Sequence, residues 1–150
     1  VLPIGIGRQL YVLSQASCHK QSSLRNTIPS CDFVEGDSLS VLLRSRDLIH
    51  MGWTLLSHPL YGNLRPHQHP YRSVLLERPA GDSRPPLDLQ SLEFLENALG
   101  VYLAQKERIL SDKGMPGTVR GDYAFIDAEL MKESLSRYGL WPRESLKTGH

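Results

Sequence analysis

Short apolar runs that alternate with helical patterns are the feature that most constrains the fold of this chain. Four runs rich in apolar residues predict strands, at residues 9–14, 31–35, 53–57 and 72–77. Runs of this length and composition are typical of strands that helices cover within a layered sheet. The chain is therefore expected to form a sheet and to supply its own covering helices.

Three segments predict helices. In the first, Asp37 or Ser38 can cap the free N–H groups of the first turn, and Gly52 fits the left-handed position after the last turn. Its expected buried face is Val41, Leu42, Ser45, Leu48 and Ile49. The second helix begins after Asp88, with an apolar stripe at Leu89, Leu92, Leu95, Leu99 and Leu103. The third begins at Asp122, with Ala124, Ala128, Met131, Leu135 and Tyr138 at helical spacing.

Together these elements predict an α/β fold: a small layered domain of three to four mostly parallel strands, with helices packed on the sheet. The strands at 53–57 and 72–77 leave an antiparallel pairing open. A length of 150 residues suits one domain over 1–150, with 1–7 and 142–150 expected to be loosely ordered.

Composition narrows the class of partner and the compartment. Seventeen Lys and Arg nearly balance sixteen Asp and Glu, so no general charge favours nucleic acid, and no apolar run is long enough to span a membrane. Cys18 and Cys31 do not form a CxxC pattern. We interpret both as reduced thiols in a cytoplasmic protein. Oligomeric state and cofactor are left undefined.

The segment 57–73 combines polar side chains with residues that restrict the backbone. Pro59, Pro66 and Pro70 fix backbone angles, and the pair Gly62–Asn63 favours a left-handed turn. Long shaped loops in compact domains are often functional. We therefore expect this loop to hold a defined shape and to be the place where a ligand binds.

An anion site is the first chemical interpretation of this loop. Arg65 and Arg72 carry forked donors that match a carboxylate or a phosphate. The candidate ligand-binding residues are Ser57, His58, Gly62, Asn63, Arg65, Tyr71, Arg72 and Ser73. The alternative is that both arginines are solvated, or paired with acidic neighbours such as Glu77.

A metal site is the second interpretation. His50, His58, His67 and His69 offer imidazole ligands, although no HExxH or paired CxxC pattern fixes their geometry. Ordinary surface histidines are the alternative. Either Asp122 or Asp127 can also serve as a catalytic acid, with a helix cap and a solvated helix position as the simpler explanation.

Two stretches resemble a known family. The first runs from Arg46 through His58-Pro59-Leu60 to Gly62 and continues in Arg65-Pro66 and in Pro70-Tyr71-Arg72-Ser73. The second is the run at 122–127. Both are similar to the GrdX family of small proteins associated with glycine, sarcosine and betaine reductase systems. The resemblance implies an accessory role beside such a system and supplies no catalytic residues; His67 and His69 depart from its pattern.

Two functional hypotheses follow, and whether the protein is an enzyme stays open. The first is an accessory domain whose 57–73 loop binds a small anionic metabolite or a protein of an amino-acid reductase system. The second is a metal-dependent enzyme that uses the loop histidines. Nucleic acid and membrane are not expected as partners.

Overall fold

The computed structural model describes residues 8–14, 31–63, 65–79 and 85–138. The predictions for 1–7, for 142–150 and for Cys18, together with the side chain of Cys31, lie outside these residues. The elements in chain order are β1 (Arg8–Ser14), β2 (Cys31–Phe33), α3 (Ser38–His50), β3 (Thr54–Leu55), β4 (Ser73–Pro79), α4 (Leu89–Ala104) and α5 (Gly117–Arg137), with short 3-10 turns at Tyr61–Asn63 and Lys106–Arg108.

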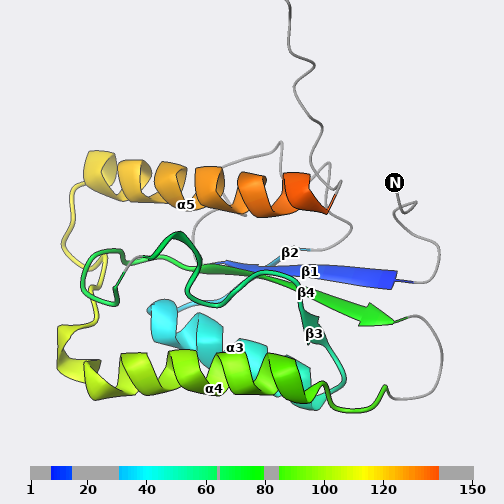
Figure 1. The fold of residues 1–150 in the computed structure, drawn as a ribbon. Coiled ribbons are helices and arrows are strands. Elements are labelled where there is room, and N and C mark those ends of the chain that lie inside the picture. Colours follow the sequence, from blue (N-terminus) through cyan, green and yellow to red (C-terminus); the bar gives the residue numbers. More distant parts are fainter. Residues whose placement is uncertain (1–7, 15–30, 64, 80–84, 139–150) are drawn as a thin grey trace, which may run out of the picture.

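Figure 1 shows three layers, with α5 on one face of the sheet and with α3 and α4 on the other. The strands lie in the order β2-β1-β4-β3. Strand β1 runs parallel to β2, whereas β4 runs antiparallel to both β1 and β3. The α/β class and the packing of helices on the sheet are therefore confirmed.

The prediction of a mostly parallel sheet is wrong, because two of the three strand pairings are antiparallel. A parallel pair needs a crossover connection that carries the chain back across the sheet, usually through a helix. Between β3 and β4 the described chain contains only the 3-10 turn at Tyr61–Asn63. The chain therefore returns beside β3 in the opposite direction, as the open alternative for these strands predicted.

The first predicted helix matches the structure closely. The Asp37 side chain accepts a hydrogen bond from the Ser40 backbone N–H at 3.1 Å, which satisfies one donor of the first turn of α3. Gly52 follows the helix with a φ of 99°, and a Cβ there would lie 2.8 Å from Pro85 Cδ. The left-handed Gly52 ends the helix where the sequence indicates, and the close approach of Pro85 leaves no room for a side chain there.

The other two helices differ from their predictions. In α4, Leu95 and Leu99 are buried, but Leu89 and Leu103 are 71% and 53% exposed, so the buried face is rotated toward Ala98 and Tyr102. Helix α5 begins at Gly117 instead of Asp122. Its first turn is exposed throughout, and such a turn leaves no apolar period in the sequence.

An apolar core fills the space between the sheet and the α3/α4 layer. Val74 and Leu76 of β4 face this layer, as alternate residues of a strand do. The cluster comprises Leu39, Val41, Leu42, Leu48, Ile49, Trp53, Val74, Leu76, Leu95, Ala98, Leu99 and Tyr102. No helix in the described part of the chain has the length and apolar character that a membrane crossing requires.

Candidate functional site

The loop between β3 and β4 is built around a tight turn. Gly62 has a φ of 78°, a backbone conformation that side chains disfavour, and a Cβ there would lie 2.7 Å from Leu130 Cδ1 of α5. The backbone N–H of Tyr61 donates to the His58 carbonyl at 3.0 Å. Glycine is therefore needed both for the turn and for the close approach of α5.

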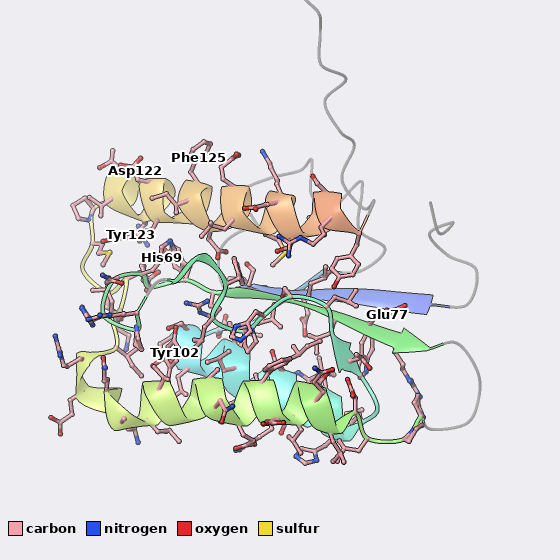
Figure 2. The ribbon with its side chains drawn as sticks, viewed as in Figure 1. His69, Glu77, Tyr102, Asp122, Tyr123 and Phe125 are labelled. Carbon is pink, nitrogen blue, oxygen red and sulfur yellow. The ribbon has the colours of Figure 1, made fainter. Side chains whose placement is uncertain are left out.

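Arg72 is buried and donates hydrogen bonds to backbone carbonyls of the loop. Its side chain is only 3% exposed, and its Nε donates to the Tyr102 hydroxyl of α4 at 3.0 Å. Its Nη1 donates to the Pro59 carbonyl at 3.0 Å and to the Tyr61 carbonyl at 3.3 Å. The guanidinium also lies 5.6 Å from the centre of the Tyr61 ring. Figure 2 shows Tyr102 extending from α4 toward this loop.

The next residue, Ser73, faces the opposite side of the sheet, where α5 lies. Its Oγ donates to Asp127 Oδ2 at 2.5 Å, and the Tyr61 hydroxyl donates to Asp127 Oδ1 at 2.9 Å. The Ser73 backbone N–H in turn donates to the Tyr61 hydroxyl at 3.3 Å. One carboxylate of α5 therefore joins the first residue of β4 to the turn of the loop.

Burial controls the ionisation of these groups. Asp127 is 3% exposed, and burial raises its pKa, while hydroxyl donation from Ser73 and Tyr61 and the nearby charges of His69 and Arg72 oppose the rise. Burial, and then the Asp127 charge, raises the pKa of Tyr61 well above its ordinary value. The hydroxyl of Tyr61 is therefore held protonated and acts as a donor.

His69 completes this group of residues, which we call the buried polar cluster: Tyr61, His69, Arg72, Ser73 and Asp127. Its Nδ1 accepts the Tyr71 N–H at 3.0 Å, and its ring lies edge-on to the Tyr123 ring at 5.0 Å (Figure 2). Burial lowers the pKa of His69, and its Nε2 has no hydrogen-bond partner among the described residues. Because Nδ1 accepts, a neutral His69 carries its proton on Nε2.

A second set of contacts ties the loop to the segment between α4 and α5. The Tyr71 hydroxyl donates to Asp112 Oδ2 at 2.9 Å, and the Leu110 N–H donates to the Pro66 carbonyl at 3.0 Å. Burial, followed by the hydrogen bond to Asp112, raises the pKa of Tyr71 to about 12. The expectation of a shaped loop thus has a structural basis at both of its ends.

A pocket of about 190 Å³ opens between the loop and the C-terminal half of α5. This outer pocket is lined by Leu56, Ser57, His58, Tyr61, Gly62, Leu130, Glu133, Ser134, Arg137 and Tyr138. The Tyr138 hydroxyl donates to the Leu56 carbonyl at 2.7 Å and joins the end of the helix to the start of the loop. Glu133 and Arg137 form an exposed ion pair at 3.9 Å.

The structure divides the predicted anion-site residues into two groups. Ser57, His58 and Gly62 line the outer pocket, and the Ser57 Oγ also accepts the Leu75 N–H at 2.9 Å. Arg72 and Ser73 belong to the buried polar cluster, and Tyr71 is buried beside it. Arg65 is exposed and does not line the pocket, and the side chain of Asn63 lies outside the described atoms. Arg65 and Arg72 therefore do not donate to one common anion site.

The four predicted metal ligands are not assembled into one site. His50 and His58 are exposed, and the His58 ring lies 5.4 Å from that of Phe94. His69 is enclosed by aromatic rings, and His67 is half-buried. Within the ranges that the structure describes, no three or more His, Cys, Asp or Glu side chains are grouped to hold a metal ion.

Sequence reasoning assigned Asp127 to a solvated helix position, and that interpretation is wrong because the residue is buried. A signal was present in the sequence. Asp127 lies three residues after Ala124 and four before Met131, which places it on the apolar stripe of the helix. Asp122 and Phe125, by contrast, point away from the sheet in Figure 2. The role of Tyr61 as the partner of Asp127 carried no comparable signal.

Comparison with known proteins agrees with the resemblance drawn from the central motif. The profile of the family described as GrdX-like protein matches residues 19–136. No curated protein and no solved structure matches the chain significantly. The match includes the whole 57–73 loop and α5 up to residue 136, and so every residue of the cluster and most of the pocket lining; Arg137 and Tyr138 lie just beyond it. This chain belongs to the GrdX-like protein family.

Proposed function

We propose that this GrdX-like protein is an accessory domain that binds a small anionic metabolite in the outer pocket. The observation that carries the proposal is the meeting of Ser57, His58 and Gly62 of the loop with Arg137 of α5. A guanidinium beside a hydroxyl and an imidazole is a combination suited to a carboxylate or a phosphate.

The size of the pocket restricts the ligand. A volume of about 190 Å³ is smaller than the roughly 300–1,000 Å³ of sites that enclose drug-sized ligands. We therefore propose a ligand the size of a simple carboxylate or of inorganic phosphate. Action beside an amino-acid reductase system, which the family resemblance implies, is part of the same proposal; docking of a protein of such a system through the loop stays a separate prediction.

The ion pair on α5 adjusts the charge of the pocket. Glu133 lies 3.9 Å from Arg137 and competes with an incoming anion for the guanidinium. Both side chains are largely exposed, so their attraction is weak and an anion can replace it. Removing the Glu133 charge should therefore strengthen anion binding, whereas removing Arg137 should weaken it.

A thermal-shift series with acetate, glycolate and phosphate tests this proposal. A ligand present at 100 times its Kd stabilises a fold by roughly 2.7 kcal/mol. In a domain of this size that corresponds to a rise of about 5–10 °C in Tm. Comparing the three ligands separates a carboxylate site from a phosphate site.

Four variants locate the effect. We expect Arg137→Ala to lose the shift and Glu133→Gln to enlarge it. Arg108→Ala, an exposed arginine outside the pocket, is the matched control. Arg65→Ala tests the sequence-based prediction that Arg65 binds the anion, and it should leave the shift unchanged because Arg65 does not line the pocket. An equal shift in wild type and Arg137→Ala would remove the outer pocket as the binding site.

A further inference from the structure

Tyr61 is common to the outer pocket and to the buried polar cluster. Tyr61 lines the pocket, while its hydroxyl donates to Asp127 Oδ1 at 2.9 Å and accepts the Ser73 N–H at 3.3 Å. Its carbonyl accepts from Arg72 at 3.3 Å. The wall of the pocket is therefore held by side chains that a ligand in the pocket does not need to touch.

Asp127 is the residue on which these contacts converge. It lies on α5, whereas Tyr61, His69 and Arg72 come from the loop and Ser73 is the first residue of β4. A buried carboxylate requires partners of this kind, since a buried charge without hydrogen bonds is strongly unfavourable. Its two oxygens each accept a hydroxyl from a different segment, which fixes the distance between the loop and β4.

Gly62 transmits this constraint to the pocket. It follows Tyr61 directly, and its backbone is packed against Leu130, which also lines the pocket. A movement of Tyr61 would move the turn relative to α5 and change the pocket from two sides. Glu133 and Arg137, which also line the pocket, lie about two and three turns further along the helix that carries Asp127.

We infer that Asp127 is a positioning residue of the outer pocket, which acts through the Tyr61 hydroxyl to hold residues 57–63 in the conformation that binds an anion. The inference deepens the proposed function and rests on it for what the pocket binds. The shape of the turn can nevertheless be measured without any ligand.

Amide hydrogen exchange provides the ligand-free measurement. The N–H groups of Leu60 and Tyr61 are hydrogen-bonded within the turn, to the His58 Nδ1 and carbonyl, and they report its local opening. In Asp127→Asn and in Tyr61→Phe we expect both amides to exchange about tenfold faster than in wild type. Tyr61→Phe removes one oxygen atom and keeps the experiment informative if Asp127→Asn folds poorly.

Met131→Ala is the control for a general loss of stability. Met131 is fully buried on α5, outside the cluster and outside the pocket lining. All proteins are compared at equal free energy of unfolding, adjusted with urea. The double variant Tyr61→Phe/Asp127→Asn should exchange no faster than the faster single variant, because both changes act on the same contact: one removes the donor, and the other replaces a carboxylate acceptor with a weaker amide oxygen. Equal exchange in Met131→Ala and Asp127→Asn would overturn the inference.

Binding of acetate and of phosphate to the same variants then separates the two proposals. Both positioning variants should weaken the binding of the active probe by about tenfold, whereas Met131→Ala should not, at equal stability. Faster exchange with no binding by any protein would contradict the proposed function and leave the positioning role standing. If wild type binds the probe and Tyr61→Phe binds it equally well, the positioning role alone is contradicted.

Discussion

The two faces of the sheet are stabilised in different ways. Toward α3 and α4 the described core is apolar, and Val74 and Leu76 of β4 pack into it. Toward α5 the fully buried Ala128, Met131 and Leu135 lie on the same helix as a buried carboxylate that holds Ser73 and Tyr61. The first face depends mainly on residues of suitable volume, with the hydrogen bond from Arg72 Nε to the Tyr102 hydroxyl as a polar contact beside them, whereas the second depends on particular donors and acceptors.

This difference has a physical consequence. Apolar packing is not directional, and it tolerates adjustments of position more readily than hydrogen bonding does. A carboxylate that accepts two hydroxyls fixes the residues that donate them. The hydrogen bonds to Asp127 of α5 therefore fix Tyr61 and Ser73 of the 57–73 loop, whereas the α3/α4 face contributes to stability mainly by burying apolar side chains.

The largest expected effect comes from the apolar face. Leu99→Ala should lower the free energy of unfolding by about 3–5 kcal/mol, because it removes a buried side chain and leaves a cavity. Urea denaturation followed by circular dichroism measures this. The exposed Leu103→Ala on the same helix is the control, and it should change stability by less than about 0.5 kcal/mol. Similar losses in the two variants would contradict the assigned core.

The polar face predicts the next effect. Asp127→Ala should cost about 2–4 kcal/mol, since the buried hydroxyls of Ser73 and Tyr61 lose their acceptor. The same urea measurement applies. Glu129→Ala, an exposed acid two residues further along α5, should cost less than about 0.5 kcal/mol. A loss that small in Asp127→Ala would mean that the two hydrogen bonds to Asp127 add little to the stability of the α5 layer.

Arg72 joins α4 to the 57–73 loop and predicts a somewhat smaller effect. Arg72→Lys keeps the charge but cannot reproduce donation from both Nε and Nη1 to Tyr102 and Pro59. We expect a loss of about 1.5–3 kcal/mol in the free energy of unfolding, with Arg108→Lys as the exposed control. Full stability in Arg72→Lys would show that the forked geometry has no structural role.

On the α5 side of the sheet, His69 should make the free energy of unfolding depend on pH. Its folded pKa is lowered by burial, so the stability that it contributes is present above its ordinary pKa of about 6.5 and is lost as pH falls toward the folded value. Asp127 has a raised pKa and acts with the opposite sign, losing its contribution as pH rises through the folded value.

The measurement is the difference in free energy of unfolding between wild type and His69→Gln at pH 7.5 and pH 5.5. Wild type should lose more stability than the variant on acidification, because protonating the buried His69 is less favourable in the folded state than in the unfolded state. His58→Gln, at an exposed position, should follow wild type. A wild type that gains stability relative to His69→Gln at pH 5.5 would reverse the assigned direction of the His69 pKa.

The smallest expected effect is at the end of α5. Tyr138→Phe removes the hydroxyl that donates to the Leu56 carbonyl and should cost about 0.5–1 kcal/mol, because the side chain is partly exposed. A thermal melt measures the loss, and Tyr123→Phe serves as a second hydroxyl deletion on the same helix. A loss above that of Arg72→Lys would move the main attachment of the loop from the cluster to this contact.

Local patterns in the sequence determined much of the fold. The cap at Asp37, the left-handed glycine at Gly52 and the apolar spacing of α3 depend on neighbouring residues, and all three are present in the structure. The same spacing misplaced the buried face of α4, since a helix with leucines on several sides has no single preferred face until it packs. The direction of β4 likewise followed from its connection and not from its own residues.

The sequence by itself determined the α/β class, the family and the position of a shaped loop at 57–73. Only the tertiary structure decided that Arg72 and Ser73 point to opposite faces and that Asp127 is buried with Tyr61. The Ser73–Asp127 and Tyr61–Asp127 contacts join residues 54 and 66 positions apart, so they depend on how the layers pack. Local spacing sets which residues share a face, whereas the packed layers set which faces meet.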